Sequence, residues 1–268
     1  MLNIGWFSTG RDEAARQLLQ FVQEKIKRSE IKGKISFVFS NRDPGEAQES
    51  DLFFELVHSY GIPLICFSHK KFQSLTLTIP SSLKGEGLNE NWRLQYDREV
   101  DKRIGEFQPD LCVLAGYMLI VGEELCQKYN MINLHPAPPD GPTGSWQEVI
   151  RELIATEANK AGAMIHLVTP ELDRGAVVSY CLFPIDGDPF ASYWQNNDKD
   201  ILFRLIREYE LVREFPLITS TLQSMGQHDI NIINGRVVNA QGKPINGHDL
   251  SAEIDQVVED EIALLRLQ

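Results

Sequence analysis

Short apolar runs alternate with longer segments of helical period along the first half of the chain. The runs read as buried strands because nearly every residue in them is apolar, whereas the segments between them repeat apolar residues every three or four positions. Continuous apolar strands separated by helices indicate an α/β fold, with a mostly parallel, Rossmann-like sheet and helices on both faces. The sequence predicts strands over 3–7, 35–39, 63–67, 111–115 and 131–134, helices over 13–26, 51–60 and 92–107, a short helix before 131, and a loop over 70–90.

The second half of the chain keeps this alternation at first and then becomes helical. A helix is expected from about Ser145, strands over 163–168 and 176–183, and a helical pattern over 198–225 that is interrupted near Pro216. Asn234-Gly235 suits a two-residue type I′ turn and predicts a hairpin over 230–238. We therefore expect one domain over 1–195 and a C-terminal helical segment over 196–268 with a short hairpin and an acidic tail.

Charge and composition narrow the possible partners. The 268 residues carry 26 Lys and Arg against 38 Asp and Glu, a net charge of −12 at pH 7. Nucleic-acid binding rests on clustered cations that displace counterions from phosphates, and no such cluster is present, so no nucleic-acid partner is expected. The longest apolar run, 113–122, is far shorter than the ~20 residues of a membrane span. With no leader pattern at the start and four dispersed cysteines, the expected location is the cytoplasm, a reducing compartment.

Two polar side chains stand at the end of the apolar strand that begins at Met131. Asn133 and His135 are two residues apart, so on an extended strand they point to the same side. In open parallel sheets ligands bind beyond the carboxyl ends of the strands, where this pair emerges. Both side chains can donate a hydrogen bond, and two converging donors could hold the oxygen of a tetrahedral intermediate. A capping asparagine and a structural core histidine are the alternative, and the pair alone favours neither.

The polar turn over 171–175 offers a carboxylate between two apolar strands. Asp173 could accept a proton, orient a water molecule or hold the histidine in place. Ordinary turn formation is the commoner role of aspartate in such a sequence, and Arg174 suits a surface ion pair equally well. Asp173 is therefore a candidate in combination with Asn133 and His135, and His166 is the next candidate for a proton relay.

Together these motifs resemble those of the folate-dependent formyltransferases. The resemblance covers essentially the whole chain, and within the family it is closest to the enzymes of purine biosynthesis that formylate glycinamide ribonucleotide. It is carried by Val113-Leu114-Ala115-Gly116-Tyr117-Met118, by Asn133-Leu134-His135-Pro136 with Gly144 nine residues past the histidine, by Ala163 to Val168 leading into Leu172-Asp173-Arg174-Gly175, and by Phe39-Ser40-Asn41-Arg42 and Asn234-Gly235-Arg236-Val237.

The resemblance implies the formyltransferase fold, with the catalytic domain over 1–195. It also implies transfer of a formyl group from 10-formyltetrahydrofolate, a co-substrate, to a small primary amine, without a metal. By carry-over, Asn133 and His135 bind the formyl oxygen, and Asp173 holds the water or proton relay at the attacking amine. The residues assigned to the folate are Tyr117, Met118, Leu119, Ile120, Val121, Thr169, Glu171 and Leu172, and those assigned to the amine substrate are Gly10, Arg11 and Pro136.

Three departures from the family pattern bear on the amine acceptor. The first loop is usually a small turn rich in Gly, Ser and Asn that holds a phosphate at a helix N-terminus, but here it reads Thr9-Gly10-Arg11-Asp12-Glu13. Arg11 could serve the phosphate, whereas Asp12 and Glu13 would repel it unless they point away. Leu119 stands where the family often has arginine, and the loop over 136–140 is more proline-rich than usual.

Other functions stay open. An amino sugar nucleotide or another small amine could be the acceptor. Methionyl-tRNA is disfavoured because the relatives that use it carry a basic C-terminal domain, whereas 227–268 holds three basic and seven acidic residues. Hydrolysis of the formyl donor is disfavoured because the relatives that catalyse it carry an extra N-terminal domain, and the first strand here begins at residue 3. A non-catalytic dinucleotide-binding module would need a Gly-x-Gly-x-x-Gly turn after the first strand, where only Gly10 is present.

Overall fold

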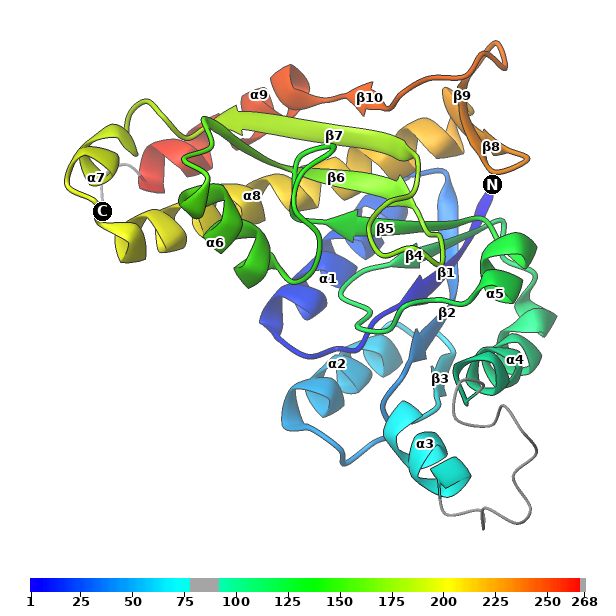
Figure 1. Cartoon of the computed structure of the whole chain (residues 1–268). Helices are drawn as coiled ribbons and strands as arrows, with labels where there is room; N and C mark the ends of the chain where they lie inside the picture. Colours follow the sequence, from blue (N-terminus) through cyan, green and yellow to red (C-terminus); the bar gives the residue numbers. More distant parts are fainter. Residues whose placement is uncertain (78–91, 266–268) are drawn as a thin grey trace. The chain divides into compact units, whose positions relative to one another are not determined.

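The computed structural model describes residues 1–77 and 92–265 (Figure 1). The chain divides into two compact units. Unit 1 comprises Met1–Ile132 and Val168–Glu171, and unit 2 comprises Asn133–Leu167 and Leu172–Gln268. The expected division into 1–195 and 196–268 differs from this partition and stays a prediction.

Unit 1 is built on parallel strands. Strand β1 (Leu2–Phe7) lies between β2 (Gly33–Ser40) and β4 (Leu111–Leu114), and β3 (Leu64–Cys66) follows β2 at the edge. Every pairing among these four strands is parallel. The predicted class, a mostly parallel sheet in an α/β fold, is confirmed.

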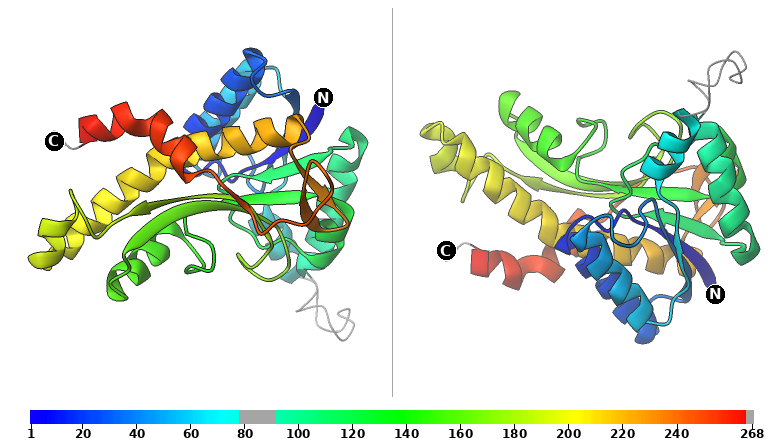
Figure 2. Two further views of the ribbon diagram at one scale, coloured as in Figure 1. Left: turned by 90° about the horizontal axis from the view of Figure 1, so that it is seen from above. Right: turned by 90° about the horizontal axis from the view of Figure 1, so that it is seen from below.

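Helices cover both faces of this sheet because the chain reverses direction across it. The connections through α1 (Glu13–Lys27) and α2 (Gln48–Ser59) step from β1 towards β3, and α4 (Trp92–Ile104) leads back to β4. Right-handed crossovers in opposite directions place their helices on opposite faces, as Figure 2 shows for α1 and α2 against α4. On the α4 side, α5 (Glu123–Lys128) completes a buried cluster that includes Phe7, Phe37, Phe39, Tyr96 and Leu125.

Unit 2 combines an antiparallel pair with long helices. Strand β6 (Lys160–Leu167) runs antiparallel to β7 (Val177–Pro184), and β10 (His248–Asp249) pairs parallel to β7. Helix α8 (Lys199–Gly226) contacts β6, β7, α6 (Trp146–Ala155) and α9 (Ser251–Leu265). The remaining elements are α7 (Ala191–Gln195) and the hairpin of β8 (Ile230–Ile233) and β9 (Arg236–Asn239).

Strand β5 (Met131–His135) begins in unit 1 and ends in unit 2. The hairpin turn has φ of 51° at Asn234 and 70° at Gly235, as a type I′ turn requires, so that expectation is confirmed. The four cysteines are free. Within residues 1–77 and 92–265, the helices lack the combination of length and apolar character that would let one cross a bilayer.

Some expectations about the elements are wrong. Residues 70–77, expected as part of a loop over 70–90, belong to helix α3 (His69–Leu77), and the amide of Lys71 donates to the Ser68 hydroxyl at its start. Residues 78–90 of that expected loop lie outside the described residues. Helix α8 continues through Pro216, because fully buried Ile206 and Leu222 hold both halves against the core despite the missing hydrogen bond.

For the expected acidic tail beyond the hairpin, no helix or strand was predicted. It contains β10 and α9, and Asp255 of α9 accepts a hydrogen bond from the guanidinium of Arg213 at 2.7 Å. Arg213 is 4% exposed, so this ion pair anchors α9 to a buried cation of α8.

Candidate active site

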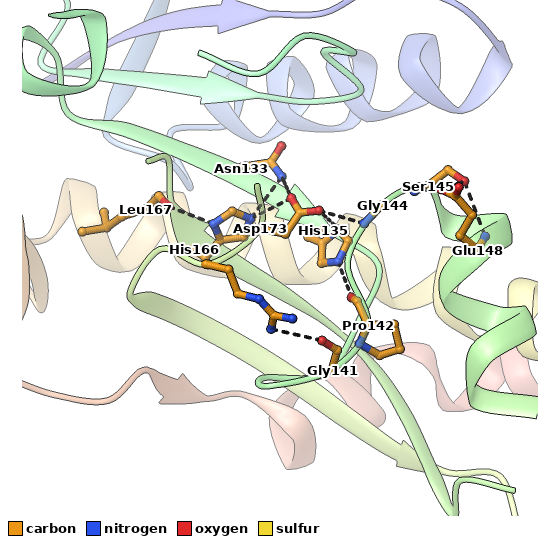
Figure 3. A network of polar contacts seen from close by, with 11 residues as sticks. Asn133, His135, Gly141, Pro142, Gly144, Ser145, Glu148, His166, Leu167 and Asp173 are labelled. Carbon is orange, nitrogen blue, oxygen red and sulfur yellow. Dashed lines mark hydrogen bonds and ion pairs between the residues drawn. The ribbon is translucent and has the colours of Figure 1, made fainter. Parts of the chain in front are cut away.

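Strand β5 and the turn after β6 bring the three expected catalytic side chains together in unit 2 (Figure 3). Asn133 Nδ2 lies 3.5 Å from Oδ1 of Asp173. His135 Nδ1 lies 3.7 Å from Oδ2 of the same carboxylate. The two residues of β5 therefore face one acidic group, one on each of its oxygens.

His166 of β6 is the fourth side chain of this cluster. Its Nε2 lies 3.1 Å from Asn133 Nδ2 and 3.5 Å from Asp173 Oδ1. Its Nδ1 lies 2.8 Å from the carbonyl oxygen of Leu167, which can only accept, so the ring carries a proton on Nδ1. In the neutral ring Nε2 then accepts from Asn133, and His166 fixes the orientation of the Asn133 amide.

The carboxylate of Asp173 is held by backbone as well as by side chains. The amide of Gly144 donates to Oδ2 at 3.0 Å. Burial by itself raises the pKa of Asp173. The contact with His166, which can donate to the carboxylate when its ring is protonated, and the hydrogen bond from the Gly144 amide outweigh burial, so the pKa lies below its ordinary value of 3.8. Asp173 is therefore ionised at neutral pH although it is only 9% exposed.

His135 is buried, and the ring nitrogen that faces away from Asp173 is hydrogen-bonded to the backbone. Its Nε2 lies 3.0 Å from the carbonyl oxygen of Pro142, so the proton of the neutral ring is on Nε2. Burial lowers the pKa of His135 below 6.5, although the bond to Pro142 and the charge of Asp173 oppose the change. The ring is neutral at pH 7, and its free Nδ1 can accept a proton beside an ionised carboxylate.

Both expected oxyanion donors are engaged by protein acceptors in this structure. The two N–H groups of the Asn133 amide point to His166 and Asp173, and the His135 N–H points to Pro142. The contact between Asn133 and Asp173 is the longest, at 3.5 Å, and so the weakest. Of the three hydrogen bonds, the one from Asn133 to Asp173 therefore costs the least free energy to break, and a formyl oxygen could take the place of the Asp173 oxygen as its acceptor.

Two glycines allow a close approach of backbone segments around Asp173. A Cβ on Gly175 would lie 1.7 Å from the carbonyl oxygen of Leu167, so only glycine lets the turn pack against the end of β6. Gly144 has φ of 104° and is followed by Ser145, which caps α6 in a reciprocal capping box with Glu148. The start of α6 thereby fixes the amide that binds Asp173.

Neither the Gly144 amide nor the Pro142 carbonyl was predicted to take part in the site. Their contacts depend on how the loop after β5 folds, which the glycines and prolines in it signal only in general terms. His166 had a clearer signal, because it is a single polar residue within the apolar run of β6. Pro136, expected near the substrate, is half-buried and follows His135 directly.

The segment expected to enclose the folate alternates between buried and exposed side chains in unit 1. Tyr117, Leu119 and Val121 pack into the core with Phe7. Met118 is 46% and Ile120 40% exposed, so two apolar side chains of this segment face outward. Of the second expected segment, Thr169 and Glu171 belong to unit 1 and are joined by a hydrogen bond from the Thr169 hydroxyl, whereas Leu172, in unit 2, is 45% exposed.

The first loop of unit 1 is tied to its surroundings by local contacts. Gly10 has φ of 60°, and a Cβ there would lie 2.8 Å from the Phe53 ring. Asp12 caps α1 by accepting from the amide of Ala15, and its other oxygen is 3.2 Å from Nε of Arg11. The guanidinium expected at the phosphate therefore has an internal partner, as does the N-terminus of α1.

Among residues 1–77 and 92–265, no group of three or more His, Cys, Asp or Glu side chains is arranged to hold a metal ion.

Comparison with known proteins gives the family. Residues 11–190 match the formyl transferase family. The phosphoribosylglycinamide formyltransferase of Escherichia coli is 27% identical over 205 residues, which cover 75% of this chain and 80% of that protein. The formyltetrahydrofolate deformylase of Haemophilus influenzae is 26% identical over 151 residues, which cover 55% of this chain and 46% of that protein.

A solved structure supports the same fold. The phosphoribosylglycinamide formyltransferase of Coxiella burnetii superposes with a TM-score of 0.66 at 22% identity, over 92% of this chain and 98% of that one. The family match spans well over half of the sequence, and it includes Asn133, His135 and Asp173. The chain therefore belongs to the formyl transferase family, and the resemblance to folate-dependent one-carbon transferases that its motifs carry is confirmed.

Proposed function

We propose that the chain transfers the formyl group of 10-formyltetrahydrofolate to the primary amine of glycinamide ribonucleotide, a step of purine biosynthesis. The observation that carries the proposal is the buried network of Asn133, His135, His166 and Asp173, which supplies a hydrogen-bond donor and a proton acceptor at one point. The match to the Escherichia coli phosphoribosylglycinamide formyltransferase supports the choice of acceptor.

The reaction needs one proton to move while two bonds exchange. The amine nitrogen attacks the formyl carbon, a new C–N bond forms, and the carbonyl electrons move onto oxygen. When the oxyanion collapses, the bond from the formyl carbon to N10 of the folate breaks. The amine has then lost one proton and N10 has gained one, so a group must carry the proton between them.

The electrostatics of the network divide these tasks between its members. Asp173, with its lowered pKa, is too weak a base to hold the proton at neutral pH. We assign the proton to Nδ1 of His135, which is neutral at pH 7 and lies 3.7 Å from Asp173 Oδ2, so the carboxylate stabilises the charged ring. Asn133, oriented by His166, donates to the formyl oxygen as it becomes negative.

The assignments of the flanking segments remain part of the proposal. The residues proposed for the folate are those over 117–121 with Thr169, Glu171 and Leu172. Pro136 is proposed for the amine substrate, because it directly follows His135 and fixes the backbone there. Gly10 is proposed to approach the acceptor through its backbone.

Hydrolysis of the donor is the second candidate. The similarity to the Haemophilus influenzae formyltetrahydrofolate deformylase favours it. Water would replace the amine as nucleophile, and the products would be formate and tetrahydrofolate. The same donor and proton acceptor would serve, so the network does not separate the two reactions.

One assay separates the candidates. The protein is incubated with 10-formyltetrahydrofolate alone, with glycinamide ribonucleotide, and with an amino sugar nucleotide, and formylated amine and formate are measured by mass spectrometry. Asp173→Asn is the matched control for contaminating activity. The proposal requires formylated glycinamide ribonucleotide in excess of formate; formate at the same rate with and without amines would instead establish hydrolysis, and product from the sugar nucleotide alone would replace the acceptor.

A further inference from the structure

Three arginines surround the first loop of unit 1, and they differ in their partners. Arg11 is paired with Asp12 at 3.2 Å, and Arg16 with Glu49 at 2.5 Å. Arg42 donates from NH1 to the hydroxyl of Ser50 at 2.9 Å. Among the described residues, no carboxylate lies within ion-pair distance of Arg42.

The acidic side chains around Arg42 in the sequence have other partners. Asp43 accepts from the amide of Ser68 and from the ammonium group of Lys71. Glu46 lies 3.7 Å from the same ammonium group, and Asp51 accepts from the amide of Gly45 at 2.8 Å. The positive charge of Arg42 is thus neutralised by none of its acidic neighbours.

Ser50 connects Arg42 to the first loop. The Ser50 hydroxyl is fully buried and donates to the carbonyl oxygen of Thr9 at 3.0 Å, while it accepts from Arg42. This chain of two hydrogen bonds fixes the guanidinium beside Thr9 and Gly10 at the carboxyl end of β1. Its remaining N–H donors have no acceptor among the described residues, and they are not buried.

We infer that Arg42 binds the phosphate of the acceptor, an inference that rests on the proposed phosphorylated amine. A guanidinium presents two parallel N–H groups to phosphate oxygens, and a half-buried, pre-positioned arginine loses little side-chain entropy on binding. Arg11 would first have to leave Asp12, whose carboxylate would stay at the N-terminus of α1 and repel the dianion. Arg42 therefore determines specificity for a phosphorylated acceptor.

The test compares Arg42→Met with Arg11→Met and with the matched control Arg16→Met. Each is assayed with glycinamide ribonucleotide and with its dephosphorylated nucleoside. Loss of a charge-assisted contact predicts that Arg42→Met raises the KM for the ribonucleotide about tenfold or more. We expect its kcat, its KM for the folate and its KM for the nucleoside to stay near those of the wild type, and Arg16→Met to leave all four unchanged.

Inorganic phosphate gives a second readout, because it should inhibit the wild type in competition with the ribonucleotide and inhibit Arg42→Met less. A wild-type KM in Arg42→Met, or a larger effect in Arg11→Met, overturns the inference and leaves the proposed function standing. A wild-type protein that formylates only amines without phosphate overturns both. A KM that rises equally for nucleoside and ribonucleotide would show that Arg42 acts on the fold and not on the phosphate.

Discussion

The carboxyl ends of the strands carry two polar regions of opposite design, one in each unit. In unit 2 a single carboxylate, Asp173, is shared by two imidazoles, an amide and a backbone N–H. In unit 1 the charged side chains at the first loop make separate, local contacts, such as the half-exposed ion pair of Arg11 with Asp12 and the hydrogen bond of Arg42 to Ser50. A shared buried charge couples its partners, so a change at one alters the others, whereas local pairs act independently. The first design suits proton transfer and the second suits binding.

The largest effect is expected from removing the shared charge. Asp173→Asn keeps the shape of the side chain, but the protonated His135 loses its stabilising anion, and turnover should fall by ~10²–10⁴-fold. Folding and the KM for the folate should largely survive. Steady-state kinetics and circular dichroism check this, and a variant with more than about a tenth of wild-type turnover would mean that the relay lies elsewhere.

Loss of one oxyanion donor should cost less. Asn133→Ala, which removes the proposed oxyanion donor, is expected to lower kcat by ~10²–10³-fold with little change in folate affinity. His135→Ala removes the proposed proton acceptor and should therefore cost about as much as Asp173→Asn. Because both residues act through one network, the double variant should cost much less than the product of the two single effects. Multiplicative effects in kinetics of the three variants would contradict the coupling described for unit 2.

Displacing the turn should have an intermediate effect. A Cβ on Gly175 would lie 1.7 Å from the Leu167 carbonyl oxygen, so Gly175→Ala must shift the turn that carries Asp173. A misplacement of this order costs up to about a hundredfold in rate. Gly187→Ala is the control, because a Cβ there has no atom within 4 Å; equal turnover in the two variants would show that the turn tolerates the shift.

The coupling can be measured directly as a change in pKa. The charge of Asp173 raises the pKa of His135, so Asp173→Asn should lower that pKa further below 6.5. Histidine NMR titration of both proteins checks this. A pKa that does not move would show that the two groups are independent.

His135 also makes stability depend on pH. Its folded-state pKa is lowered, so its contribution is present above the unfolded value near 6.5 and is lost as the pH falls towards the folded value. His135→Gln should therefore lose less stability than the wild type between about pH 7.5 and pH 5.5. Urea unfolding at the two pH values measures the difference.

The smallest effect on turnover is expected in unit 1. The Thr9 hydroxyl donates to Asn41 at 2.8 Å and accepts from the Met118 amide at 3.1 Å. Thr9→Val removes the partner of the Asn41 side-chain oxygen and of the Met118 amide. It should lower the free energy of unfolding by about 1–3 kcal/mol, with kcat nearly unchanged. Thr156→Val is the control: the exposed Thr156 hydroxyl donates to the Glu152 carbonyl oxygen at 2.8 Å, where water can take its place. The free energy of unfolding should therefore stay within about 0.5 kcal/mol of the wild type in urea unfolding. A loss of kcat comparable to that of Asn133→Ala would remove the contrast between the units.

Elements whose signals are local could be predicted, and those held by distant contacts could not. Asp12 and Ser145 cap α1 and α6 as their sequences indicate. Helix α9 was not predicted, and its contacts are distant in the chain: Asp255 pairs with Arg213, 42 residues away, and Ile254 is fully buried. Helix α8 likewise continues through Pro216 because residues before and after the proline are buried against the core. The sequence around Pro216 does not reveal this packing.

The same distinction holds within the candidate site. The shared direction of Asn133 and His135 follows from strand geometry, so the sequence predicts it. The donor from Gly144 and the acceptor at Pro142 depend on the fold of the loop over 136–145, which packs against a turn whose Asp173 is 29 residues beyond Gly144. Gly175 lies against the Leu167 carbonyl oxygen, and this contact determines the shape of the turn. The sequence alone does not predict the contact.

The hydrogen bond from Gly144 to Asp173 offers a spectroscopic probe of the site. Labelling with ¹⁵N-glycine gives a spectrum with at most 19 backbone signals, one of which comes from the amide that is hydrogen-bonded to the Asp173 carboxylate. The chemical shift of an amide proton responds to the charge of its acceptor, so this signal should move when a ligand, a proton or a substitution changes Asp173. Binding and protonation at the buried carboxylate can then be followed in the unmodified protein, without a reporter group.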